Sequence, residues 1–197
     1  MLIGRLLYPI YTLGPGKRLV IWTCGCSKEC RNCISPEWFK PIQGHYLEYS
    51  VEQLLEIIKK INDQYHPDGV TFSGGDPFEQ LDELLELLEK IHPILADVLV
   101  YTGYTLAELN QLLSPLQLQQ IRRDIAVLID GRYVDALNDN QSGLIGSTNQ
   151  NIYYFNQKIE PQYKLYLAEY GRKIQLVESE GQRYSVGIHN QGGNNVD

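Results

Sequence analysis

The sequence lacks cysteine outside one short stretch, lacks any long apolar run, and has no surplus of basic residues. All four cysteines fall within the ten positions 24–33. Cysteines that served only in packing would be scattered through the core, so this concentration predicts a metal or redox centre. No apolar run approaches the length that spans a bilayer, and we therefore expect no membrane partner.

The shortage of positive charge limits the classes of partner. With a formal net charge of −7, the chain does not offer the basic face that phosphate binding needs, so we expect no nucleic acid partner. Hydrophobic residues at 43% and charged residues at 21% are ordinary for a soluble globular protein of 197 residues. The apolar segment 1–9 is short, is interrupted by Arg5 and Pro9, and lacks a small-residue cleavage site. We therefore expect no signal peptide and a cytoplasmic location.

The spacing of the cysteines narrows the kind of centre. Cys26, Cys30 and Cys33 place three thiolates on one loop directly after the apolar run 19–22. Thiolates suit iron–sulfur clusters or zinc. A structural zinc site needs four ligands, and only Cys24, two residues before Cys26, is left to supply the fourth in a cramped site. Three cysteines on a four-iron cluster leave one iron open for a substrate or cofactor, which is a catalytic arrangement. Disulfides are a further alternative, but an acidic chain without a secretory leader favours a reducing compartment.

Short apolar runs alternate with helical periodicity over the first three quarters of the chain. This alternation predicts a parallel α/β sheet with right-handed crossovers. Residues 1–17 read as an irregular entry segment that ends in a Gly-Pro-Gly turn. Three helix starts are predicted, two by capping boxes at Ser50 and Thr105 and one by a serine cap at Ser114 that is followed by proline. The predicted strands are 18–22, 70–72, 97–101 and 125–129, and a further helix is predicted from about residue 78 to residue 91.

The pattern changes toward the C-terminus. Residues 135–151 form a polar loop, and 152–155 is a possible further strand. Residues 163–167, 172–178 and 183–188 read as short antiparallel strands, with a turn at 180–181. We therefore predict a core domain over 1–157, a β-rich extension packed on it over 158–189, and a disordered tail over 190–197.

Four polar motifs follow the predicted strands. They are the cysteine loop, residues 73–77 (Ser-Gly-Gly-Asp-Pro), residues 102–103 (Thr-Gly) and residues 130–132 (Asp-Gly-Arg). In parallel α/β sheets, ligands bind where the loops gather at the carboxyl ends of the strands. The four motifs therefore predict a single site along one edge.

The cysteine motif after a first strand resembles the signature of the radical S-adenosylmethionine (SAM) superfamily. By that resemblance, Cys26, Cys30 and Cys33 hold a [4Fe–4S] cluster whose open iron is chelated by SAM. Residues 73–77 resemble the Gly-Gly-Glu-Pro-like stretch that binds the SAM amino group, with aspartate in place of glutamate. The resemblance implies an incomplete (β/α) barrel of radical SAM type carrying the small β-rich C-terminal extension.

A longer succession of motifs resembles the activating proteins of anaerobic (class III) ribonucleotide reductases. It comprises residues 14–16, the cysteine loop, 73–77, 101–104, 128–133 and 146–150, and covers roughly residues 1–155. The resemblance implies that a flavodoxin- or ferredoxin-like donor reduces the cluster. SAM is then cleaved to methionine and a 5′-deoxyadenosyl radical, which abstracts hydrogen from a glycine of the reductase. It implies no catalytic residue beyond the cluster and SAM, and it implies SAM contacts from Asn32, Ile34, Gly74, Gly75, Asp76, Thr102, Asp130 and Asn149.

Three features depart from that resemblance. Asn32 stands where many radical SAM proteins have an aromatic residue that stacks on adenine, so we expect backbone or Trp38 to substitute. The extension after about residue 160 is absent from minimal activating proteins, and Cys24 is an extra thiol that we expect to be a bystander. Two rival functions stay open: activation of a different glycyl-radical enzyme or modification of a peptide, and a non-catalytic zinc-binding interaction module.

Overall fold

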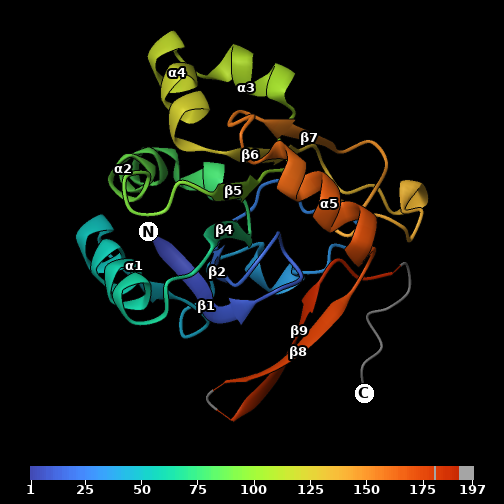
Figure 1. The fold of residues 1–197 in the computed structure, drawn as a ribbon, viewed down its shortest axis with the longest axis horizontal. Coiled ribbons are helices and arrows are strands. Elements are labelled where there is room, and N and C mark those ends of the chain that lie inside the picture. Colours follow the sequence, from blue (N-terminus) through green and yellow to red (C-terminus); the bar gives the residue numbers. More distant parts are fainter. Residues whose placement is uncertain (180, 191–197) are drawn as a thin grey trace.

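A mixed sheet of seven strands runs through the computed structural model, which describes residues 1–179 and 181–190 (Figure 1). The strand order is β3-β1-β2-β4-β5-β6-β7. The strands are β1 (Leu2–Ile10), β2 (Arg18–Thr23), β3 (Leu47–Glu48), β4 (Gly69–Gly74), β5 (Val98–Tyr101), β6 (Val127–Asp130) and β7 (Asn151–Tyr154). The four predicted strands correspond to β2, β4, β5 and β6, which pair in parallel.

The predicted incomplete (β/α) barrel is wrong, because the parallel order stops on both sides of these four strands. β1 pairs antiparallel with β2, and β7 pairs antiparallel with β6, which leaves an open mixed sheet. Another parallel strand after β6 would need a crossover, usually an α-helix. In the described structure, residues 131–150 hold only the 3₁₀ turn η3 (Asp135–Leu137), so the chain returns beside β6 in the opposite direction.

Four helices cover one face of the sheet. They are α1 (Val51–Tyr65), α2 (Leu81–Ile91, preceded by the 3₁₀ turn η2, Pro77–Gln80), α3 (Leu106–Leu112) and α4 (Pro115–Asp124). The two predicted capping boxes at Ser50 and Thr105 are present, and the predicted cap at Ser114 is a capping box as well. Buried leucines and isoleucines of these helices pack on Ile21, Phe72 and other apolar residues of the strands. No helix in the described residues is both long enough and apolar enough to cross a membrane.

The N-terminal segment is a strand and not the irregular entry that its sequence suggests. Arg5 and Pro9 interrupt its apolar pattern, yet its nine residues Leu2–Ile10 form β1, which pairs antiparallel with β2 across two register irregularities. Pairing on both edges encloses β2, and all six of its residues are buried. The tertiary partner therefore decides the conformation of this segment, since β structure depends on neighbours more than on local preference.

The C-terminal region is a helix followed by a hairpin. Residues 163–167, predicted as a strand, belong to helix α5 (Glu160–Tyr170). The helix lies on the side of the sheet opposite to α1 and α2 (Figure 1), and its Tyr163 and Tyr166, three residues apart, are buried against residues of β5 and β6. The predicted strands 172–178 and 183–188 are confirmed as β8 (Ile174–Ser179) and β9 (Gln182–Gly187). The boundary at residue 157 stays a prediction, and the predicted tail lies, apart from residue 190, outside the described residues.

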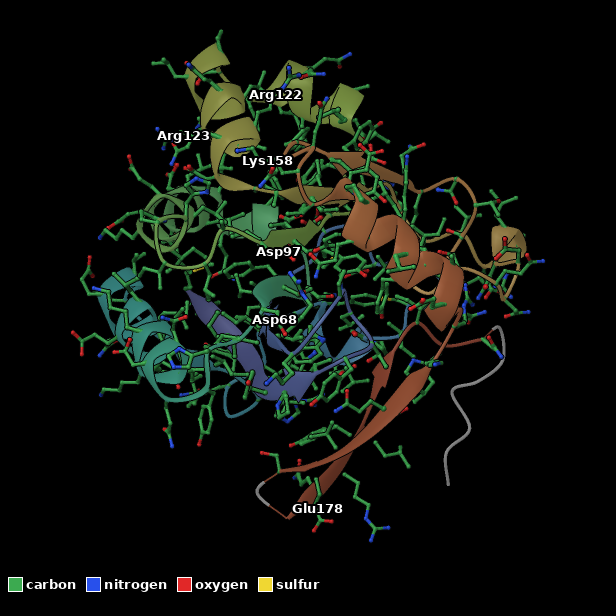
Figure 2. All side chains as sticks on the ribbon, in the orientation of Figure 1. Asp68, Asp97, Arg122, Arg123, Lys158 and Glu178 are labelled. Carbon is green, nitrogen blue, oxygen red and sulfur yellow. The ribbon has the colours of Figure 1, made fainter. Side chains whose placement is uncertain are left out.

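Helix α5 is anchored in the interior by a buried polar network. The Arg18 guanidinium donates to the Asp97 carboxylate at 2.8 Å, and the Tyr163 hydroxyl donates to the same carboxylate at 2.7 Å. Asp97 lies near the centre of the molecule between the sheet and α5 (Figure 2). Because burial raises the pKa of Tyr163 well above its usual value, this phenol stays protonated and keeps donating.

Candidate active site around the cysteine loop

The carboxyl ends of the parallel strands open into one cavity of about 510 Å³. Cys26, Cys30 and Cys33 line it together with residues that follow β4, β5 and β6. The predicted contacts Asn32, Ile34, Gly74, Gly75 and Thr102 also line it. Residues from four separate motifs therefore meet at one place, as the strand-end rule predicts.

The cysteine loop is held by backbone contacts to the segment that follows it. Gly25, with φ of +108°, lets the chain turn sharply out of β2. The amide of Gly25 then donates to the Trp38 carbonyl at 2.8 Å, and the amide of Cys26 donates to the Phe39 carbonyl at 2.9 Å. These bonds tie the loop to the 3₁₀ turn η1 (Pro36–Trp38) and fix where the thiols point.

The four cysteines divide into three and one. Cys24 is 1% exposed and packs in an apolar cluster with Trp22 and Trp38, whereas the other three line the cavity. All four are free thiols. Burial raises the pKa of Cys33 to about 11, with the nearby Cys30 and Cys26 thiols adding to the shift, so metal must displace a proton there.

Three soft thiolates on one loop fit an iron–sulfur cluster, whose ligands bind different irons. In the described residues, no group of three or more His, Cys, Asp or Glu side chains is placed to hold a single metal ion. The four-cysteine zinc site also lacks its fourth member on the cavity wall, since Cys24 is buried elsewhere. The donor set thus fits a cluster better than one zinc ion.

Lys28 lies between the first two cluster cysteines in the sequence, and its side chain holds the cysteine loop against the segments that follow β4 and β5. Its side chain is 3% exposed, and its ammonium lies 2.8 Å from the Glu79 carboxylate and 3.7 Å from that of Asp76. The same nitrogen lies 3.1 Å from the centre of the Tyr104 ring. Burial lowers the pKa of Lys28, but the hydrogen bonds to Glu79 and Tyr104 and the two carboxylate charges outweigh it and raise the pKa overall. Lys28 is therefore a charged and buried residue that anchors the cysteine loop, and no motif in the sequence pointed to it.

Asp76 points into the protein and not into the cavity. Its carboxylate accepts from the Thr102 hydroxyl at 2.9 Å, the Gly103 amide at 2.9 Å and the Phe78 amide at 3.1 Å. Burial raises its pKa, against the opposing effects of Lys28 and these hydrogen bonds. Asp76 thus joins the ends of β4 and β5, and its predicted contact with SAM stays a prediction.

The glycine pair after β4 is required by the protein's own packing. A Cβ on Gly75 would lie 2.3 Å from the carbonyl oxygen of Gly25, and one on Gly74 would lie 2.6 Å from that of Thr23. Gly74 also has a φ of +100°. The pair lets β4 end directly against the cysteine loop. A side chain here would displace the cysteines of that loop and would also obstruct a molecule bound in the cavity.

Like Asp76, the predicted contacts Asp130 and Asn149 do not line the cavity. Asp130 accepts from the Leu106 amide at 2.7 Å and from the Asn151 amide at 3.1 Å. The Asn149 side chain donates to the Arg132 carbonyl at 2.8 Å. Their direct neighbours Gly131 and Gln150 line the cavity instead. The two motifs therefore reach the cavity through these neighbours, and the predicted SAM contacts of Asp130 and Asn149 stay predictions.

Aromatic residues are available in the cavity, though not the expected one. Trp38 is 5% exposed and does not line the cavity, whereas Tyr133, Tyr101 and Trp22 do. The side-chain amide of Asn32 donates to the Asp135 carboxylate at 3.0 Å, and this bond joins the cysteine loop to η3. Tyr133, beside that bridge and hydrogen-bonded to Asp135 at 2.8 Å, is the aromatic ring nearest in the chain to the 130–132 motif.

The C-terminal extension contributes a wall that the sequence analysis did not foresee. Residues 185–189 line the cavity, as do Arg5 of β1 and Leu13 of the turn after it. The period-two pattern of β9 predicted a strand, but no local signal indicates that this strand packs beside a loop 150 residues earlier.

Comparison with known proteins matches residues 12–153 to a family described as a 4Fe–4S single cluster domain. Similar proteins named anaerobic ribonucleoside-triphosphate reductase-activating protein include those of two bacteria and a phage. That of Salmonella typhi is 33% identical over 153 residues, which cover 75% of this chain and 95% of that protein. That of Escherichia coli K12 is 32% identical with the same coverage, and that of Enterobacteria phage T4 is 26% identical over 64% of this chain and 78% of that protein.

Proposed function

This chain belongs to the family of anaerobic ribonucleoside-triphosphate reductase-activating proteins, and we propose that its cavity is where a [4Fe–4S] cluster and SAM act together on a glycine of the partner reductase. The observation that carries the proposal is the division of the cysteines. Three line a cavity built from the strand ends, and the fourth is buried apart from them.

In this proposal Cys26, Cys30 and Cys33 hold the cluster, which leaves one iron for SAM. When bound, the cluster and SAM supply the electron and the hydrogen-abstracting radical that activation of a glycyl-radical enzyme requires. The protein's part is to hold the ligands rigidly. Lys28 and the backbone bonds to η1 fix the cysteine loop, and Asp76 joins it to the neighbouring strand ends.

SAM would lie along the strand ends, between the cysteine loop and the loop that follows β6. Gly74, Gly75 and Thr102 line this half of the cavity, and Gly131 and Gln150 lie next to the predicted Asp130 and Asn149. Glycines expose backbone groups that hydrogen-bond a ligand at close range. Asn32 and Ile34 stand at the mouth on the cysteine loop, and Tyr133 offers a ring there.

The proposal includes two features that come from chemistry alone. A low-potential one-electron donor of the flavodoxin or ferredoxin type must reduce the cluster. A cytoplasmic location supplies both that donor and the reducing conditions under which four free thiols persist. Among the open rivals, the reductase is favoured as partner over other glycyl-radical enzymes by the names of the relatives.

The test is cleavage of SAM by anaerobically reconstituted protein with a chemical reductant. We expect iron and sulfide at four each per chain, and equal amounts of methionine and 5′-deoxyadenosine. Cys30→Ala should remove the cluster and both products, while Cys24→Ala keeps them. Stoichiometric zinc in place of iron, or a full cluster that leaves SAM intact, would contradict the proposal.

A further inference from the structure

One half of the cavity is not explained by the cluster and SAM. The strand-end motifs account for the side formed by β4, β5 and β6. The cavity is also lined by Arg5 of β1, Glu37 of η1 and the consecutive residues 185–189. These last residues lie beyond residue 153, where the match to the cluster-domain family ends.

The extension is fixed in place and is not a loose tail. The Arg172 guanidinium donates to the Asn138 side chain at 2.6 Å, the Ser142 carbonyl at 3.1 Å and the His189 carbonyl at 2.9 Å. The side chain of Gln175 bonds the backbone of β1 and its following turn, and Thr12 donates to the Val186 carbonyl at 2.9 Å. Residues 185–189 are therefore a built wall, while Glu178 near the hairpin tip points away from the body (Figure 2).

Arg5 is the cation that joins this wall to the sheet. Its guanidinium carbon lies 3.9 Å from the centre of the Tyr184 ring of β9, 5.3 Å from that of Trp38 and 5.9 Å from that of Trp22. Aromatic faces hold a guanidinium by its flat sides while its N–H edge makes hydrogen bonds. Arg5 makes one such bond to the Tyr184 hydroxyl, and its guanidinium has further N–H donors. In the described residues, no carboxylate lies within 4.0 Å of it.

Glu37 supplies an acceptor on the same side of the cavity. Its charge is close enough to act on Arg5, yet the two side chains form no ion pair in the described structure. A donor and an acceptor kept apart on one wall match a peptide, which presents a carbonyl and an N–H at each unit. An anionic ligand would bring its negative charge next to the Glu37 carboxylate. Arg5 and Glu37 together therefore favour a neutral peptide main chain as the ligand.

We propose that Arg5, Glu37 and residues 185–189 form the subsite that binds the main chain of the reductase's glycine-containing segment. Arg5 donates to a carbonyl of that segment, and Glu37 accepts from one of its amides. The proposal rests on the proposed function, and it makes the C-terminal extension a determinant of which partner is activated.

The test compares partner binding with SAM binding in the full-length, cluster-loaded protein. The KM for the anaerobic reductase is taken from the rate at which its glycyl radical appears by electron paramagnetic resonance, and the Kd for SAM from equilibrium titration. We expect Arg5→Met to raise the KM by about tenfold or more, the effect of losing a hydrogen bond to a charged group, and to change the Kd for SAM much less. Arg5→Lys should recover part of the loss.

Glu37→Gln, at an exposed position, should raise the KM several-fold without disturbing the core, and so keeps the test valid if Arg5→Met folds poorly. Arg183→Met is the matched control, because Arg183 lies on the same hairpin with its side chain 86% exposed. Equal losses in SAM binding and in partner KM would assign Arg5 to SAM and overturn the inference. An unchanged KM in both variants would also overturn it while the proposed function stands. If wild-type protein cleaves SAM but never forms the radical on the reductase, the choice of partner and this subsite fall together.

Discussion

Lys28→Met should destabilise the protein and loosen the cysteine loop, because the buried Lys28 ammonium anchors the segment between Cys26 and Cys30. Methionine keeps the apolar stem that packs beside Gly103 and removes only the charge. The change leaves Asp76, whose side chain is 1% exposed, without its cation. It also removes the ion pair with the partly exposed Glu79 at 2.8 Å and the cation–π contact with Tyr104 at 3.1 Å.

The expected loss is about 3 kcal/mol of unfolding free energy. Removing one partner of a fully buried ion pair costs about 3–5 kcal/mol, but this pair is long, at 3.7 Å, and Asp76 keeps three other hydrogen-bond donors. The Asp76 pair therefore contributes about 1–2 kcal/mol, the partly exposed Glu79 pair less than about 1 kcal/mol, and the desolvated cation–π contact about 1–2 kcal/mol. At about 2–4 °C per kcal/mol for a domain of this size, Tm should fall by roughly 6–12 °C.

The assay is thermal and urea denaturation under anaerobic reducing conditions, with iron content measured in parallel. Lys40→Met is the control, because Lys40 pairs with Glu29 of the same loop at 3.4 Å while its side chain is 77% exposed. That surface pair should cost less than about 1 kcal/mol. Equal losses for the two variants, or a loss below about 0.5 kcal/mol for Lys28→Met, would refute the role of Lys28 as a buried clamp.

Three further predictions address the site and the extension. Single replacement of Cys26, Cys30 or Cys33 by Ala should abolish the cluster absorption, whereas Cys24→Ala should retain it; loss of the cluster in Cys24→Ala with retention in another variant would make the ligand assignment wrong. Gly75→Ala should lower both iron content and SAM affinity, because its Cβ would lie 2.3 Å from the Gly25 carbonyl oxygen. Gly131→Ala is strained by its φ of +95° and should lose stability, but its nearest neighbour lies at 3.6 Å and is not in the cysteine loop, so it should keep its iron; normal iron in Gly75→Ala would contradict the packing argument. Truncation after Gln157 should prevent recovery of folded, cluster-loaded protein, because it removes Tyr163, which is 0% exposed and bonds Asp97; a truncated protein that activates the reductase normally would show that the extension is dispensable.

The site was more predictable than the fold because its chemistry is local in sequence. Three cysteines on one loop and polar motifs after apolar runs are visible without any tertiary contact, and the structure brings those motifs to one cavity. Which atom faces the ligand depends on packing, however. Asp76, Asp130 and Asn149 turn to backbone partners of their own chain, and their neighbours line the cavity.

The errors in the fold arise from long-range pairing. Strand positions follow from apolar runs, but whether a sheet closes depends on what pairs at its edges, and β1 and β7 both pair antiparallel. In α5 the apolar side chains 163, 165 and 167 alternate as in a strand, yet Leu165 is 57% exposed. Pro161 in the first turn is the helix signal that the alternation masked.

The central claim is that this cavity installs a glycyl radical on an anaerobic ribonucleotide reductase. The most direct measurement is the electron paramagnetic resonance spectrum of the reductase after anaerobic incubation with the reconstituted protein, SAM and a reductant. We predict a doublet from an α-carbon radical on a glycine, which depends on SAM and is absent with the Cys30→Ala variant. A reductase that stays free of radical while SAM is converted to 5′-deoxyadenosine would contradict it.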